Sequence, residues 1–254
     1  MRIDLNDIRV RLDQQTERII SGLKDRSRYL SNHGVFDKPF AEGLSWFGYR
    51  LREEQSLDSA FGRYDFEDQH PILFKKEALT QPKIRRARQE QQLIPVSIDF
   101  SLKIIQFYKE LLNKICRQGE DPNTYGETVK LDVNNVLCLY ERICGIGPYV
   151  AESKLRRDHS LAYVVDPEDI RVRLVHSRRE EEVIEKAFQI AERYEMPNPE
   201  SVRWVFRRII DLTLDDEVAY IQAVQKKEEK LRTPPGWGQE PRKEGNGSKG
   251  WGCR

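Results

Sequence analysis

The stretch FRRIIDLTLDDEVAYIQAV, residues 206–224, repeats apolar residues at the spacing of an α-helix. Two polar residues, Thr213 and Glu217, occupy positions of that apolar stripe. The stripe of a surface helix faces the protein core, so we expect both side chains to point inward. An inward charge without a partner costs on the order of several kcal/mol. Glu217 therefore needs a partner from another helix.

Four further charged residues lie on the apolar faces of predicted helices: Arg9 beside Leu5, Leu12 and Ile19; Arg142 beside Leu139 and Ile146; Lys154 beside Ile146 and Val150; and Glu180 beside Val183 and Ile184. Each one alone can be a boundary residue whose charged end reaches solvent. Together, three cations and two carboxylates on inward faces predict a buried site with a net positive charge. Such a site suits a small ligand that carries several negative charges.

The overall charge argues against other classes of ligand. Lys and Arg number 43 and Asp and Glu number 42, so the formal charge is +1 and does not favour nucleic acid or an acidic membrane. The densest basic run, Lys83–Arg88, is interpreted as a solvated surface, with a phosphate contact as the alternative. No run approaches the roughly 18 apolar residues of a membrane span.

The sequence predicts a cytoplasmic protein without a cofactor. The first residues form an amphipathic helix rather than a signal or transit peptide. The four cysteines lack CxxC spacing and form no metal-ligand pattern with the histidines, so we expect reduced thiols and no metal.

Helical periodicity dominates the chain, and no convincing β-alternation is present. We expect an all-α helical bundle with long first, central and last helices. The expected helices span about 4–30, 40–61, 97–116, 127–157, 177–194 and 199–230, and the central one is disturbed by Gly145, Gly147 and Pro148. Residues 1–230 are predicted to form one domain, and the Gly-, Pro- and Lys-rich residues 231–254 a disordered tail.

Motifs at these positions resemble the all-helical chorismate mutases, most closely the long, regulated form of fungi and plants. Gly147-Pro-Tyr-Val-Ala-Glu-Ser-Lys154 resembles the family segment Gly-Lys-Phe-Val-Ala-Glu-Ala-Lys, which ends in the catalytic lysine. Thr213 and Glu217 reproduce the Thr-x-x-x-Glu pair of its last helix. The resemblance spans roughly residues 1–228, and its strength lies in five motifs in the family's order.

The three other motifs are less specific. Asp7-Ile-Arg9-Val-Arg-Leu12 resembles Asn-Ile-Arg-x-x-Leu, and Arg142 resembles the arginine that binds a substrate carboxylate. His176-Ser-Arg-Arg-Glu-Glu-Glu-Val-Ile184 resembles Asn-Ser-x-x-Glu-Glu-x-Ile, with histidine in place of Asn or Asp.

The resemblance implies a substrate, chorismate, which is a dicarboxylate, and its unimolecular Claisen rearrangement to prephenate in the shikimate pathway. No cofactor or metal is needed. Arg9 and Arg142 are then expected to bind carboxylates, as the guanidinium fork suits them. Lys154 and a protonated Glu217 would donate to the ether oxygen of the bond that breaks.

Four further residues receive binding roles from the resemblance. Glu180 is expected to accept a hydrogen bond from the ring hydroxyl, with His176 and Arg179 nearby and Thr213 steadying a carboxylate. Burial is expected to raise the pKa of Glu217.

One departure from the family concerns spacing. This chain has one residue more between Arg142 and Lys154, at Cys144-Gly-Ile-Gly-Pro148. One added residue rotates a regular helix by about 100°. A bulge or break must absorb that residue if both cations are to face one pocket.

A second departure concerns regulation. The family's long form is a dimer that binds aromatic amino acids at its interface. An Arg-Arg pair of that effector site appears here as Gly62-Arg63 and a Gly-Ser pair as Gly126-Glu127, while Asn123 remains. We therefore expect a homodimer with weak or altered binding of effector at Arg63, Asn123 and Gly126.

Two alternatives remain open at this stage. A mutase acting on an amino analogue of chorismate is the nearest, because His176 stands at the contact for the ring substituent. A catalytically inactive helical binding or regulatory subunit is the other, and the altered spacing supports it. Replacing buried charges by apolar residues would stabilise such a subunit, so the retained Lys154 and Glu217 argue against it.

Overall fold

The structure, a computed structural model, describes residues 5–66, 68–84, 93–96 and 98–232. The elements are α1 (Leu5–Arg26), α2 (Gly34–Asp37), β1 (Pro39–Ala41), β2 (Leu44–Ser45), α3 (Trp46–Ala60), α4 (Ser101–Ile115), α5 (Tyr125–Tyr140), α6 (Gly147–Arg157), α7 (Pro167–Leu174), α8 (Ser177–Arg193) and α9 (Glu200–Arg232). Single 3-10 turns are η1 (Arg63–Asp65), η2 (Lys76–Ala78), η3 (Pro122–Thr124) and η5 (His159–Tyr163), and η4 (Glu141–Gly145) is a π-helical turn.

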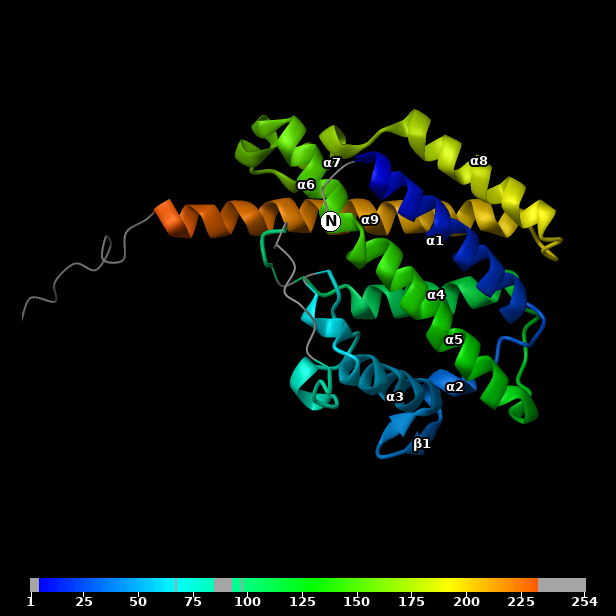
Figure 1. Ribbon diagram of the computed structural model, residues 1–254. Coiled ribbons are helices and arrows are strands. Elements are labelled where there is room, and N and C mark those ends of the chain that lie inside the picture. The colour runs from blue at the N-terminus through cyan, green and yellow to red at the C-terminus, as the bar shows by residue number, and fades with distance from the viewer. Residues whose placement is uncertain (1–4, 67, 85–92, 97, 233–254) are drawn as a thin grey trace, which may run out of the picture.

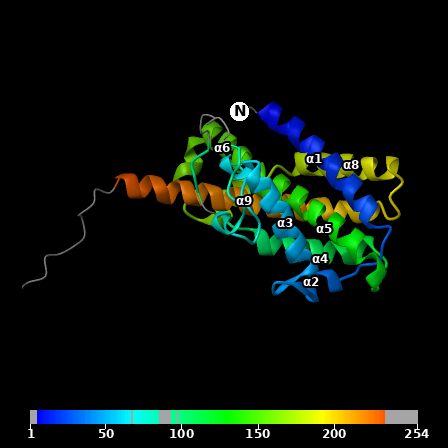
Figure 2. The same cartoon turned by 60° about the horizontal axis from the view of Figure 1, so that its bottom comes forward.

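The longest helix, α9, crosses the whole molecule (Figure 1). It packs against α8, α6 and α7, and α4 contacts it as well. The segment α5–η4–α6 forms one interrupted rod that runs across α9, and α1 lies along this rod and against α8 (Figures 1 and 2). The expected all-α bundle with long first, central and last helices is confirmed.

Two apolar clusters form the core. The larger one includes Ile209 and Leu212 of α9, and the smaller one includes Leu214 and Val218 of the same helix. Ile210 packs against both clusters. Thr213 and Glu217 therefore lie on the stretch of α9 where its contacts change from the larger cluster to the smaller one.

The prediction of a helix over residues 40–61 was wrong about where that helix begins. Residues 39–45 form a two-stranded antiparallel hairpin, β1–β2, and the helix begins only at Trp46. Glu42 and Gly43 have φ values of +53° and +75°, which a tight hairpin turn requires and a helix excludes. The Ser45 hydroxyl then caps α3 by accepting a hydrogen bond from the Gly48 N–H.

The first helix ends earlier than expected, at Arg26, because this side chain turns into the core. Its Nε lies 2.6 Å from Asp132 Oδ1, and both side chains are fully buried. Its terminal nitrogens donate to the carbonyl oxygens of Leu30 and Ser31, which follow the helix. The Tyr108 hydroxyl also donates to Asp132 Oδ1, at 2.8 Å. This network joins α1, α4 and α5.

Three further observations concern the start of α4, the cysteines and the lengths of the helices. Asp99 accepts a hydrogen bond from Ser101 N at the start of α4, and most of the residues predicted to form the tail lie outside the described part of the chain. Cys116, Cys138 and Cys144 are free thiols. None of the described helices has the length and apolar character needed to cross a bilayer.

Candidate active site

Residues of α1, η4, α6, α7, α8 and α9 line a cavity of about 560 Å³. All eight residues predicted for the catalytic site line it: Arg9 of α1; Arg142 of η4; Lys154 of α6; His176 at the start of α8, with Arg179 and Glu180; and Thr213 and Glu217 of α9. Apolar walls come from residues such as Ile8, Val150, Leu174 and Ile210. The sequence pattern thus identified groups that the fold brings together.

Lys154 and Glu217 form the most buried ion pair of the cavity. Lys154 Nζ lies 2.7 Å from Glu217 Oε2 and also donates to the Leu174 carbonyl oxygen at 3.0 Å. The Glu217 side chain is 4% exposed and that of Lys154 is 28% exposed. Burial raises the pKa of Glu217, as expected, while the charges of Lys154 and Arg142 oppose that rise.

Arg142 is buried, and its Nε has no hydrogen-bond partner within the described part of the chain. Burial lowers the pKa of its guanidinium to about 10, and the carboxylates of Glu217 and Asp13 oppose that shift. A buried guanidinium with an unused donor lowers the stability of the folded protein. A bound anion would supply the missing acceptor, so this arrangement is expected of an anion-binding arginine.

The π-helical turn Glu141–Gly145 absorbs the extra residue between Arg142 and Lys154. A π-type turn closes its hydrogen bonds over five residues instead of four, so it takes up one added residue without reversing the helix. Both cations consequently line the same cavity. The predicted bulge is confirmed.

At the start of α8, His176 and Glu180 form a reciprocal cap. His176 Nδ1 accepts a hydrogen bond from the Arg179 N–H at 3.4 Å, and Glu180 Oε1 accepts one from the His176 N–H at 2.8 Å. This cap fixes both side chains at the cavity. Thr213 donates to the Ile209 carbonyl oxygen at 2.7 Å, so its hydroxyl oxygen still has capacity to accept.

One expectation about burial was wrong. Arg9 is exposed instead of inward-facing, although it lines the cavity. It lies in the first turns of α1, where the neighbouring Ile8 takes the buried position instead. His176 and Arg179 are also exposed, so these three residues lie at the solvent side of the site.

The sequence interpretation missed four charged residues of the cavity: Asp13, Arg157, Arg178 and Glu182. Asp13 lies one helical turn after Arg9, and Arg157 one turn after Lys154, so helical spacing alone would have found both. With them, the cavity wall carries six Arg or Lys side chains against four carboxylates. The surplus of positive charge matches a dianion. No described His, Cys, Asp and Glu side chains cluster as a metal site would require.

Comparison with known proteins identifies relatives of this chain. No protein-family model matches it. Chorismate mutase 1, chloroplastic, of Petunia hybrida is 33% identical over 159 residues, which cover 60% of this chain and 48% of the petunia protein. Chorismate mutase of Schizosaccharomyces pombe is 26% identical over 198 residues, 73% of this chain and 77% of that protein.

A solved structure agrees. The chorismate mutase of Candida albicans, in complex with L-Trp, superposes with a TM-score of 0.81 at 22% identity, over 90% of this chain and 95% of that one. The chain has the fold of the chorismate mutases. The resemblance drawn from the motifs is confirmed, although the chain spans only about half the length of the plant relative.

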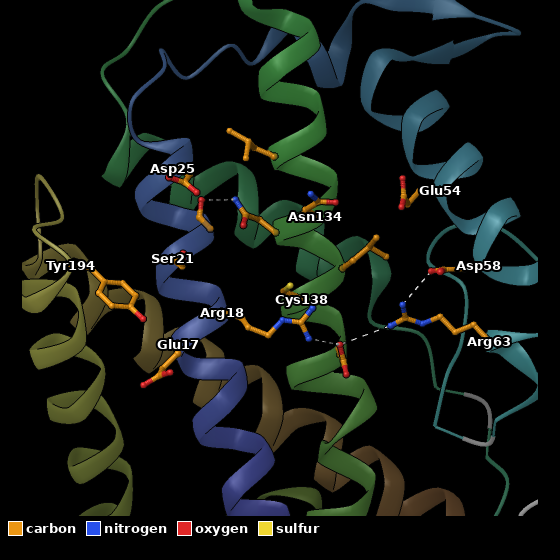
Figure 3. Close-up of a pocket in the computed structure, with 15 residues that line it drawn as sticks. Glu17, Arg18, Ser21, Asp25, Glu54, Asp58, Arg63, Asn134, Cys138 and Tyr194 are labelled. Carbon is orange, nitrogen blue, oxygen red and sulfur yellow. Dashed lines mark hydrogen bonds and ion pairs between the residues drawn. The ribbon is translucent and has the colours of Figure 1, made fainter. Parts of the chain in front are cut away.

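The three expected effector residues lie in different parts of the structure. Arg63 lines a second, open cavity of about 860 Å³ between α1, α3 and α5 (Figure 3). There it lies 3.2 Å from Asp58, and both Arg63 and Arg18 lie 3.9 Å from Glu141. Asn123 and Gly126 lie at the opposite end of α5, roughly 22 Å along that helix from Glu141. One chain alone does not bring the three effector residues together.

Proposed function

We propose that the protein is a chorismate mutase that converts chorismate to prephenate. The observation that carries this proposal is the single cavity in which Arg142, Lys154 and Glu217 converge from three segments of the chain. The relatives named chorismate mutases support it. In the reaction an ether C–O bond breaks and a C–C bond forms within one molecule, so no group needs to be transferred to the protein.

We expect the charged side chains that line the cavity to bind the substrate. The buried Arg142, with its free Nε, binds one carboxylate in the interior, and the exposed Arg9 binds the other near solvent. Thr213 steadies a carboxylate. Holding both ends of a flexible dianion favours the compact conformer in which the bonding carbons approach each other.

Catalysis follows from the donors beside the breaking bond. Negative charge builds on the ether oxygen as the bond breaks, and the Lys154 ammonium donates to it. Glu217, once protonated, donates to the same oxygen. The entering carboxylates add negative charge near Glu217, which favours its protonated form beyond the effect of burial.

The ring substituent distinguishes chorismate from its amino analogue. Because His176 Nδ1 accepts the cap hydrogen bond from Arg179, its proton resides on Nε2 in the neutral ring, which then offers a donor. A hydroxyl group can accept from this donor and also donate to the Glu180 carboxylate, whereas an ammonium group can only donate. Purified protein is therefore expected to consume chorismate faster than the amino analogue. The reverse order favours the analogue as substrate, and stabilisation against heat by both without turnover favours a binding subunit.

Glu217→Gln tests the protonated carboxyl. A carboxyl with a raised pKa is protonated below that pKa and loses its proton as pH rises through it. Wild-type turnover is therefore expected to fall by about tenfold per pH unit above the pKa, whereas the amide keeps a donor at every pH. Rate–pH profiles of both proteins provide the measurement. An unchanged alkaline decline in Glu217→Gln would contradict the role.

We further propose a homodimer whose single helical domain spans residues 1–230, acting in the cytoplasm. The free thiols of Cys116, Cys138 and Cys144 fit a reducing compartment. The separation of Arg63 from Asn123 and Gly126 within one chain fits an effector site shared between two chains.

With Gly62 and Glu127 in place of a cation and a small residue, this shared site is expected to bind aromatic amino acids weakly. Sedimentation should give twice the chain mass, and calorimetry with tyrosine and tryptophan should give dissociation constants above about 1 mM, a binding free energy weaker than roughly −4 kcal/mol. Micromolar binding would refute the weakened site, and a monomer would refute the shared one.

A further inference from the structure

The π-helical turn that carries Arg142 has a second polar contact on its other side. Arg142 and Cys144 are two positions apart, so their side chains leave the helix in roughly opposite directions. Arg142 lines the catalytic cavity, whereas Cys144 and Asp216 line a separate cavity of about 200 Å³. Asp216 directly precedes Glu217, so α9 contacts both sides of the turn.

Asp216 is buried close to Gly147. Its side chain is 1% exposed, and its Oδ2 has no hydrogen-bond partner among the described residues. A Cβ placed on Gly147 would lie 2.6 Å from that oxygen, closer than real side chains allow. Burial raises the pKa of Asp216 to about 7, which makes the neutral carboxyl a substantial form near neutral pH. Asp216 therefore lies beside Gly147 and shares a cavity wall with Cys144, and these two residues flank Ile146 where η4 joins α6.

We propose that Cys144, Gly147 and Asp216 form a joint that holds the π-helical turn against α9 and thereby positions Arg142 relative to Glu217. The inference rests on the proposed mutase function. None of the three residues lines the catalytic cavity, so each is a positioning residue. π-type turns are rare and locally less favourable than α-helix. Without the joint, relaxation to regular α-helix would rotate Arg142 by about 100° relative to Lys154.

Gly147→Ala tests the joint because the added methyl group meets Asp216. Gly147 has no positive φ, so alanine fits its backbone. The variant is expected to turn over chorismate at least about tenfold less efficiently, with a higher KM and a lower kcat, since displaced catalytic groups are costly. Asp216→Ser removes the carboxyl from the joint without adding a clash, and is expected to cause a loss of similar size. Gly145→Ala is the matched control, because its Cβ would meet its nearest neighbour at 3.4 Å.

The results separate the two proposals. Steady-state kinetics are measured at 25 °C, and thermal unfolding shows that each variant is folded there. Loss in both Gly147→Ala and Asp216→Ser, with no effect in Gly145→Ala, supports the joint. An active wild type with a fully active Gly147→Ala or a fully active Asp216→Ser overturns the joint alone. An inactive wild type overturns the mutase function and the joint with it.

Discussion

Lys154→Ala is expected to lower the rate of chorismate conversion by about 100- to 1,000-fold. Loss of one preorganised donor to a developing oxyanion typically has this effect. Here the donor is held by Glu217 at 2.7 Å and by the Leu174 carbonyl at 3.0 Å, so its position is fixed before substrate binds. Absorbance of chorismate at saturating concentration gives kcat, and lower concentrations give kcat/KM.

Lys130→Ala is the control for this prediction. Lys130 is exposed on α5, far along the rod from the cavity, and its loss is expected to leave the rate within about twofold, as for most surface changes. A Lys154→Ala protein that kept more than a tenth of the wild-type rate would contradict the assigned role. Melting temperatures of both variants separate a catalytic defect from unfolding.

Arg26→Met is expected to destabilise the protein by about 3–5 kcal/mol. Removing the guanidinium leaves the Asp132 carboxylate buried without its cation, at a position where both side chains are fully excluded from solvent. Two carbonyl oxygens, of Leu30 and Ser31, also lose their donors. Urea unfolding measures the free-energy difference, provided that the transition is two-state.

Arg28→Met provides the comparison two residues later. Arg28 pairs with Asp25 at 3.3 Å, but both side chains are largely exposed, so this loss should be below about 1 kcal/mol. Adding Asp132→Asn to Arg26→Met removes the stranded charge while retaining an acceptor for Tyr108, and should recover part of the loss. Equal effects of Arg26→Met and Arg28→Met would contradict the importance of the buried pair.

The fold and the inner part of the site were predictable because both follow from helical period. Thr213 and Glu217 interrupt an apolar stripe, and Arg142 and Lys154 do the same on another helix. All four are fixed by packing, so position along the helix determines the direction of the side chain. The extra residue before Lys154 also predicted an irregular turn, because a regular helix would have separated the two cations.

The remaining features depend on tertiary contacts, and the helical repeat of apolar residues in the sequence does not encode such contacts. Residues 39–45 contain aromatic and apolar residues that suit a helix, but two consecutive positive φ values make a hairpin. Asp216 looks like one more charge in the run Asp215-Asp216-Glu217, and its burial depends on Cys144 and Gly147 of another segment. The expected effector residues are set far apart within one chain, and only the proposed homodimer would bring them together.

The most direct test of the central claim is NMR of chorismate mixed with the purified wild-type protein. The account predicts stoichiometric formation of prephenate at a rate far above that of chorismate alone, with no other product and no added metal or cofactor. Arg142→Ala in parallel should lose most of that rate. Chorismate that stays unchanged, or that forms a product other than prephenate, would contradict the account.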